Sequence, residues 1–285
     1  MTLSPKSLIV VTWDGKSQPL NHIYFDASPA FDLLVFDYSG MGNHALFNAI
    51  APKYILSVAT ECKGQIIHAL YTYIKSIDTA STYQYIGIFD DDQYTTISDI
   101  NKLLFIANLE QLDVFQPSLS HDSYYDNRQF IHKPGFQLLL ADWVEVMSPF
   151  YRMDIFDAFA PHCKENISGT GVDLYLVPTI QYLLEKTKTA VVHAVQIKHM
   201  RPVRTGVRVF SNGKTSVQEI QIMQALSKSL LLQRNTKPFD SPSYLKIEAH
   251  LNLESKGNIT LTDKLNRILP LFKNVYRMLV DASYR

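Results

Sequence analysis

The sequence has little cysteine and no excess of charge of either sign. Its 285 residues include 2 cysteines, Cys62 and Cys163, which form no CxxC pair and no disulfide framework. This usage is typical of a protein in the reducing cytosol. The 27 basic residues balance the 27 acidic residues, which argues against a nucleic-acid-binding surface and against an acidic disordered tail.

Long apolar runs are also absent. The first one covers only residues 8–12, too short for a signal peptide. No run approaches the roughly 20 apolar residues of a membrane-spanning helix. We therefore expect a cytoplasmic protein with at most a peripheral contact to the inner face of a membrane.

The short motifs of several enzyme classes are missing as well. Lys63 and Gly64 fall short of the GxxxxGK[ST] phosphate loop, so a nucleoside triphosphatase of that type is excluded. The two glycines within residues 39–44 do not form a GxGxxG dinucleotide fingerprint. GxSxG, HExxH and a recognisable Cys–His pair are absent too.

Strand-like and helix-like segments alternate through the first 120 residues. The strand-like segments are 7–13, 31–40, 83–89 and 113–119, and the helix-like segments are 64–77 and 96–112. Ser98 is the expected N-cap of the second helix. This alternation predicts an α/β fold with a largely parallel sheet, in which ligands bind at the carboxyl ends of the strands.

Aspartates follow three of these strand-like runs. Asp14 and Asp37 each come directly after an apolar run, and Asp90, Asp91 and Asp92 follow the run at 83–89. Asp90 and Asp92 should point to the same side, with Asp91 turned away. Two convergent carboxylates suit Mg²⁺ or Mn²⁺, which take oxygen ligands and often bridge to phosphates. A solvated turn that caps the following helix would explain the same residues.

Two histidines lie in the strand-like segment 189–203. His193 sits within an apolar run, which favours a packed core residue. His199 stands at the end of the segment beside Arg201 and Arg204, which better suits a metal ligand or a phosphate contact.

Two carboxylates stand out in the middle of the chain. Glu145 lies between two valines, so it is either on the solvent face of an edge strand or turned into a site. Asp173 follows two glycines and precedes an apolar helix, where it is either an N-cap or a general base kept ionised by the helix dipole. Lys63, ahead of a helix, could hold a phosphate or a carboxylate.

The order of these segments resembles an uncharacterised glycosyltransferase-like family of bacteria and plants. The likeness covers about residues 60–205 and rests on FDDD, DVFQPSLSHDS, WVEVMSPFYR, GTGVDLYL and VVHAVQIKH, in this order. More broadly, the arrangement resembles the GT-A glycosyltransferases. That resemblance implies a Rossmann-type nucleotide-binding sheet with helices on both faces over residues 1–205, with a nucleotide-sugar half (1–120) and an acceptor half (121–205). We expect residues 206–285 to form a mainly helical C-terminal extension.

The resemblance also implies roles for individual residues. Asp90, Asp92 and His199 would bind the metal, Asp173 would activate the acceptor, and Glu145 would line the acceptor or sugar site. Gln116 and Pro117 would shape the pocket. The donor would contact Asp90 and four further residues, namely Thr12, Asp14, Asp37 and Lys63.

These roles imply a glycosyltransferase that uses Mn²⁺ or Mg²⁺ and a nucleotide-sugar donor, most simply a UDP-sugar, to modify a hydroxyl of a glycan or glycolipid. Bacterial surface glycan synthesis is the expected setting. The alternatives are a nucleotidyltransferase or phosphohydrolase, and an inactive binding protein on the same fold. The basic amphipathic segment 262–282 is either a peripheral membrane contact or a helix packed on the core.

Overall fold

The computed structural model describes residues 6–42, 44–47, 52–77, 83–202, 206–233 and 254–255. The main strands are β1 (Lys6–Trp13), β3 (Asp32–Asp37), β4 (Tyr54–Ser57), β5 (Tyr83–Phe89), β7 (Val114–Leu119) and β10 (Thr189–His199). The shorter strands are β2 (Ile23–Tyr24), β6 (Gln93–Thr96), β8 (Leu139–Leu140), β9 (Phe150–Arg152) and β11 (Glu254–Ser255).

The α-helices are α1 (Lys63–Ser76), α2 (Ile97–Glu110), α3 (Met153–Phe159), α4 (Val177–Leu183) and α5 (Ser216–Gln233). Short helical turns are η1 (His44–Phe47), η3 (Arg128–Phe130), η4 (Ala160–Glu165) and η5 (Val172–Leu176). The segments expected from the sequence agree with these elements to within a few residues. Thr96, rather than Ser98, caps α2, because its side chain accepts the N–H of Asp99 at 3.0 Å.

The strands form a mixed sheet in the order β11-β8-β10-β7-β9-β5-β1-β3-β4. The pairs β1–β3, β1–β5, β3–β4 and β7–β10 are parallel, whereas β8 and β9 join antiparallel. β6 leaves the sheet directly after the three aspartates and pairs with β2 and with the end of β10. The expected α/β fold with a largely parallel sheet is confirmed.

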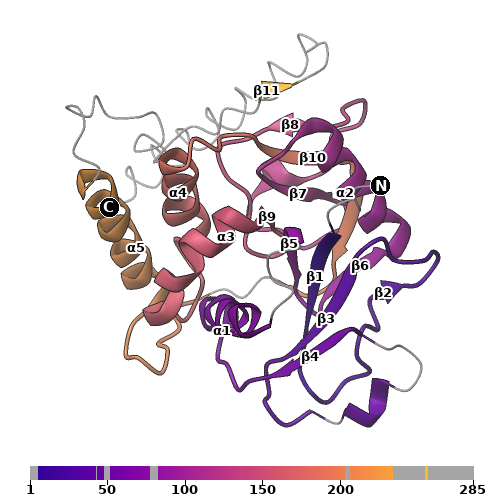
Figure 1. The fold of residues 1–285 in the computed structure, drawn as a ribbon, viewed down its shortest axis with the longest axis horizontal. Helices are drawn as coiled ribbons and strands as arrows, with labels where there is room; N and C mark the ends of the chain where they lie inside the picture. Colours follow the sequence, from indigo (N-terminus) through magenta and orange to yellow (C-terminus); the bar gives the residue numbers. More distant parts are fainter. Residues whose placement is uncertain are drawn as a thin grey trace, which may run out of the picture.

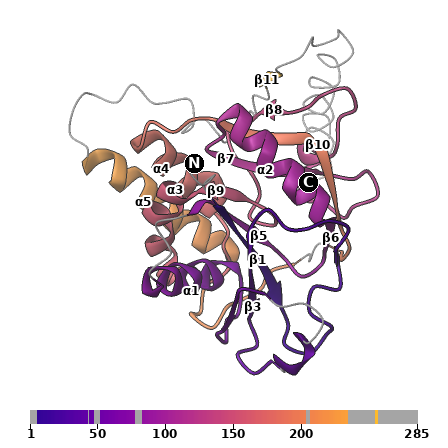
Figure 2. The same ribbon diagram turned by 45° about the vertical axis from the view of Figure 1, so that its right-hand side comes forward.

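Helices cover both faces of the sheet, as Figures 1 and 2 show. On β1, Ile9 and Val11 point to the face that α2 covers, and Leu8 and Val10 point to the face that α1 covers. This alternation follows from the two-residue period of a strand. The second face also packs α3, α4 and Met223 of α5. Residue Met223 of the predicted C-terminal extension therefore packs on the same core as the sheet.

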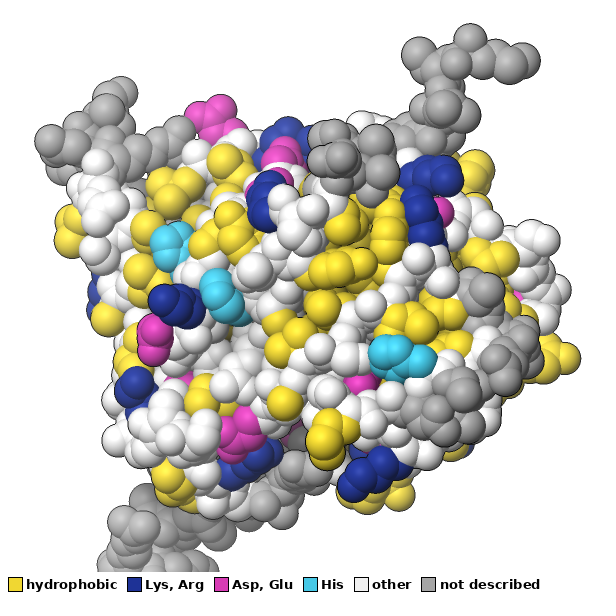
Figure 3. Space-filling view, turned by 60° about the horizontal axis from the view of Figure 1, so that its bottom comes forward, with side chains coloured by type: hydrophobic (Ala, Val, Ile, Leu, Met, Phe, Trp, Pro, Cys, Tyr) yellow, Lys and Arg dark blue, Asp and Glu magenta, His cyan; other side chains and the backbone are white. Residues whose placement is uncertain are grey.

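The charge balance of the sequence is visible on the surface. On the face in Figure 3, basic and acidic side chains are interspersed, and hydrophobic atoms gather near its centre. Within the part of the chain that the structure describes, no helix is both long and apolar enough to cross a bilayer. The segment 262–282 lies outside the described residues.

Gly87 in β5 makes a close contact that a larger residue would disturb. A Cβ added there would lie 2.5 Å from Cε1 of the buried Phe150 ring on β9. We expect Gly87→Ala to lower the free energy of unfolding by about 1–3 kcal/mol in urea denaturation. A Phe150→Leu background should absorb much of this loss, because the smaller side chain makes room. Equal urea midpoints for Gly87→Ala and wild type would contradict this packing.

Candidate active site

The parallel strands bring three aspartate-bearing loops to one edge of the sheet. The register pairs Trp13 with Asp37 across β1 and β3, and Val11 with Phe89 across β1 and β5. The residues after these strands therefore lie at the same carboxyl edge. The expected convergence of these loops is present in the structure.

The side chains of Asp14 and Asp37 each accept hydrogen bonds from residues of their own loops. Asp14 Oδ1 accepts the backbone N–H of Ser17 at 2.8 Å and its hydroxyl at 2.7 Å. The buried Asp37 accepts the hydroxyl of Ser39 at 2.6 Å and the N–H of Gly42 at 2.7 Å. Burial works to raise the pKa of both carboxyls, but these hydrogen bonds lower it below the usual range. A donor-binding role for either residue stays a prediction.

Asp90 is paired with Lys63, a residue of α1. Lys63 Nζ lies 2.5 Å from Asp90 Oδ1, and the lysine side chain is only 7% exposed. Burial raises the pKa of Asp90, and Lys63 opposes that rise. The ammonium of Lys63 is therefore held at the carboxyl edge, where a phosphate would also meet it.

Asp91, which we expected to turn away from Asp90 and Asp92, is tied into the fold by three neighbours. Its backbone N–H donates to Thr12 Oγ1 at 3.0 Å, and its Oδ2 accepts the hydroxyl of Tyr38 at 2.9 Å. Arg201 pairs with its Oδ1. Asp91 thus ties together the ends of β1, β3, β5 and β10, and its carboxylate is stabilised by neighbours from distant parts of the chain.

Asp92 lies beside His199, as the predicted metal site requires. His199 Nε2 is 3.3 Å from Asp92 Oδ2, and its Nδ1 is 2.9 Å from the carbonyl oxygen of Tyr124. Arg201 Nε is 2.9 Å from the same carboxylate oxygen. Burial works to raise the pKa of Asp92, but His199 and Arg201 lower it overall. Burial works to lower the pKa of His199, but Asp92 raises it overall.

Two of the three predicted metal ligands fit a divalent cation. Oδ1 of Asp92 is buried and has no hydrogen-bond partner among the described residues. With Nδ1–H of His199 bound to a carbonyl oxygen, Nε2 could bind a metal in place of its present contact with Asp92 Oδ2. Asp90, however, is paired with Lys63. Within the described ranges, no group of three or more His, Cys, Asp or Glu side chains is arranged to hold a metal.

A second polar cluster surrounds Glu145, which is in a loop and not in an edge strand. Its side chain is turned inward, and the residue is 5% exposed. Its N–H donates to Gln116 Oε1 at 2.6 Å, and its Oε1 accepts the side-chain amide of Asn127 at 2.6 Å. Gln116, expected to shape the pocket, therefore positions Glu145. Burial raises the pKa of Glu145 to about 8, and the nearby Asp173 and Asp126 contribute.

Asp173 stands at the start of η5, directly before α4. Its Oδ1 accepts the N–H of Leu174 at 2.9 Å, and Gly171 before it has a φ of 84°. Burial raises the pKa of Asp173 to about 7, although backbone N–H groups oppose that rise. The carboxylate is therefore only partly ionised near neutral pH, which is the range suited to a general base.

The loop before Asp173 is fixed by α5 and α1. The buried Glu219 of α5 accepts the N–H of Ile167 at 2.9 Å and the N–H of Ser168 at 2.7 Å. Gly64, next to Lys63, donates its N–H to the carbonyl of Ile167 at 3.0 Å. A Cβ on Gly64 would lie 2.1 Å from a carbonyl oxygen, so only glycine permits this approach. The two polar clusters are thus joined through the start of α1.

His199 connects the two clusters electrostatically, because its positive charge lowers the pKa of the Glu145 carboxyl.

His193 has no contact that would make it part of this site among the described residues. It is 1% exposed, its Nδ1 accepts the N–H of Lys133 at 3.1 Å, and burial lowers its pKa to about 3. The packed core interpretation fits His193 better than a ligand role.

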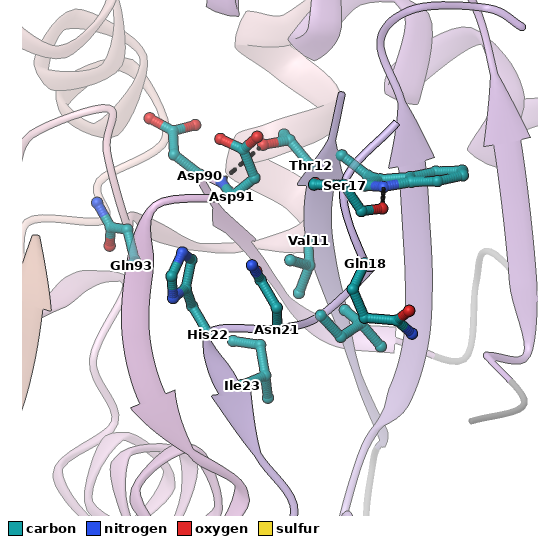
Figure 4. Close-up of a pocket in the computed structure, with 12 residues that line it drawn as sticks. Val11, Thr12, Ser17, Gln18, Asn21, His22, Ile23, Asp90, Asp91 and Gln93 are labelled. Carbon is teal, nitrogen blue, oxygen red and sulfur yellow. Dashed lines mark hydrogen bonds between the residues drawn. The ribbon is translucent and has the colours of Figure 1, made fainter. Parts of the chain in front are cut away.

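A pocket opens between the loop after β1 and the aspartate cluster (Figure 4). Its empty volume is about 240 Å³, part of which is open to solvent. Thr12, Asp90 and Asp91 lie at one end, and Asn21 and His22 contribute from the loop that leads to β2. The pocket therefore includes two of the predicted donor-binding residues.

The sequence did not indicate which residues contact Asp91 and Glu145 in the folded protein. Tyr38 and Asn127 carry no motif, and no spacing in the sequence connects them to Asp91 or Glu145. Arg201 was visible only as a basic residue near His199, and its contact with Asp91 and Asp92 depends on how β10 ends.

Comparison with solved structures shows the fold. S. aureus TarS 1–349 in complex with UDP-GlcNAc is 13% identical with a TM-score of 0.51, over 82% of this chain and 68% of that chain. S. aureus TarS 1–349 without a ligand in its description is 10% identical with a TM-score of 0.52, over 81% and 67%. This chain covers 40% of the longer TarS structure. TarS is a glycosyltransferase with a GT-A-like fold, so the present chain has a glycosyltransferase-like fold.

The other comparisons add no family. 4-Diphosphocytidyl-2C-methyl-D-erythritol synthase from Anaerococcus prevotii is 10% identical with a TM-score of 0.41, over 79% of this chain and 97% of that chain. No protein-family model and no curated protein matches the sequence. The resemblance to a particular uncharacterised family is therefore supported at the level of the fold alone.

Lys63 and Asp90 should depend on each other for stability. We expect Lys63→Met to lower the free energy of unfolding by about 1–3 kcal/mol, because it leaves the partly buried carboxylate of Asp90 without its cation. The double variant Lys63→Met/Asp90→Asn should recover part of this loss in urea denaturation. A double variant as unstable as the sum of both single variants would show that the pair is not coupled.

Proposed function

We propose that this protein is a metal-dependent glycosyltransferase that moves a sugar from a nucleotide-sugar donor, a UDP-sugar in the simplest case, to a hydroxyl acceptor. One observation carries the proposal: a cation-paired aspartate cluster lies in one site with the buried carboxyl of Glu145 and the partly exposed carboxyl of Asp173, on a fold like that of TarS. TarS structures with UDP-GlcNAc and with UDP support the choice of donor.

The aspartate cluster would receive the donor diphosphate. Asp92 and His199 would hold a Mn²⁺ or Mg²⁺ ion, which neutralises negative charge on the leaving diphosphate as a Lewis acid. Lys63 would contact a phosphate oxygen, and Asp90 would be its partner or bind the ribose. Thr12, together with the loops closed by Asp14 and Asp37, would contact the nucleoside.

Asp173 would act as the general base. Its carboxylate would take the proton of the acceptor hydroxyl as that oxygen attacks the anomeric carbon and the nucleoside diphosphate leaves. One such displacement inverts the anomeric centre. General-base catalysis of this kind contributes roughly 10²–10⁴-fold to the rate. Glu145 would line the acceptor site beside it.

The acceptor would be a glycan or glycolipid, and synthesis of a bacterial surface glycan at the cytoplasmic face of the membrane is the setting we propose. Nucleotidyl transfer or phosphate hydrolysis on the same site would release pyrophosphate or phosphate, so product analysis distinguishes them. No observation on the described residues favours either alternative.

Donor binding should require both the cation and Asp92. In a thermal-shift screen of nucleotide-sugars, we expect the largest rise in melting temperature when the donor and Mn²⁺ are both present. Asp92→Asn should weaken metal-dependent donor binding by about 10–100-fold, because a ligand of the cation is lost. Asp157→Asn is the matched control, since that carboxylate pairs with Lys75 on the surface. Equal metal-dependent shifts for both variants would rule out Asp92 as a ligand.

Turnover should depend on the ionisation of Asp173. Because the base acts only when deprotonated, kcat should fall as the pH drops through about 7. Asp173→Asn should lower kcat by about 10²–10⁴-fold and retain donor affinity in calorimetry. A variant that keeps the wild-type kcat and its acidic limb would exclude Asp173 as the base.

A further inference from the structure

Glu145 is a buried carboxyl with one oxygen that has no partner. Its Oε1 accepts the amide of Asn127 at 2.6 Å. Its Oε2 is buried and makes no hydrogen bond within the described parts of the chain. A carboxylate in this state would bury a negative charge with a single hydrogen bond, which is costly. A protonated carboxyl would instead present an O–H that needs an acceptor.

The groups around Glu145 disfavour its ionisation. The charged groups that act on it are Asp173 from η5, Asp126 from the loop after β7, and His199 from the end of β10, and the two aspartates outnumber the one histidine. No lysine or arginine is paired with Glu145 among the described residues. Two carboxyls that share a poorly solvated site do not both ionise readily.

Hydrogen bonds decide which of the two carboxyls keeps the proton. Asp173 receives backbone N–H donors, including that of Leu174 at 2.9 Å, and these stabilise its ionised form. Among the described residues, the side chain of Glu145 receives a hydrogen bond from the neutral amide of Asn127 alone. Asp173 is therefore the first to ionise, and Glu145 retains its proton to a higher pH.

We propose that Glu145 is a neutral carboxylic acid at neutral pH and donates a hydrogen bond through Oε2 to an oxygen of the acceptor substrate. This inference rests on the proposed transferase function. The proton of the reacting hydroxyl goes to Asp173, while Glu145 keeps its own proton throughout. The acceptor class that matches this arrangement is a sugar with several hydroxyls, in which one hydroxyl oxygen attacks and another oxygen accepts the bond from Glu145.

The first test needs no substrate and measures stability against pH. A folded Glu145 that holds its proton above the range of an unfolded glutamate makes the wild type lose stability as the pH rises from about 5 to about 8. Glu145→Gln has the same shape and does not titrate, so its melting temperature relative to wild type should rise across this window. Glu165→Gln, which removes an exposed carboxylate, is the matched control and should show no such trend.

The second test compares two variants at one site in the transferase assay. Glutamine presents an N–H donor where the neutral acid presents its O–H, whereas leucine presents none. We expect the acceptor kcat/KM of Glu145→Gln to exceed that of Glu145→Leu by roughly 10-fold or more, the effect of one hydrogen bond in a buried site. Donor affinity in calorimetry should be the same for both variants.

The outcomes separate this inference from the proposed function. A wild type that transfers no sugar from any nucleotide-sugar refutes the transferase function, and the pH test still decides the state of Glu145. A Glu145→Gln variant whose stability runs parallel to wild type between pH 5 and 8 shows that Glu145 is ionised, and overturns the inference. Equal acceptor kcat/KM for the glutamine and leucine variants of an active enzyme also overturns it.

Discussion

The site depends on how the negative charge at the end of β5 is balanced. Three adjacent carboxylates repel one another, and they can share this edge only because cations and hydrogen-bond donors from other elements meet them. Lys63 comes from α1, and Arg201 follows the end of β10. Tyr38, just after β3, donates to Asp91. The same contacts that neutralise the charge therefore fix the relative positions of the strand ends and loops that would hold a nucleotide.

The two polar clusters of the site have opposite electrostatic designs. The aspartate cluster is paired with cations, and His199 and Arg201 keep the pKa of Asp92 low despite burial. Glu145 and Asp173 have no cationic partner among the described residues, and burial raises the pKa of both toward neutrality. Binding a diphosphate with a cation and transferring a proton make these different demands. The two clusters are connected through the contact between α1 and the loop before Asp173.

Much of the fold could be predicted because strand and helix periods are local properties of a chain. The apolar runs predicted β1, β3, β5, β7 and β10, and their alternation with helices predicted the α/β sheet. One error was local, in the cap of α2, and the contacts of Asp91 were missed because they join distant segments of the chain. Thr96 replaced Ser98 as cap because both residues are good caps and lie two positions apart. We expected Asp91 to turn away from Asp90 and Asp92, but the sequence did not show that Tyr38 and Arg201, 53 and 110 positions distant, contact its carboxylate.

The amino-acid sequence alone was sufficient to indicate which residue types gather at the carboxyl edge, since each aspartate follows its strand directly. The sequence alone could not show which partner each aspartate has in the folded protein. Asp14 and Asp37 close their own turns, Asp90 binds Lys63, and Asp92 meets His199 only through folding. The ionisation of Glu145 likewise depends on burial and on neighbours from other loops. Charge and hydrogen bonding act through space, so these properties arise only when segments distant in the chain are packed together.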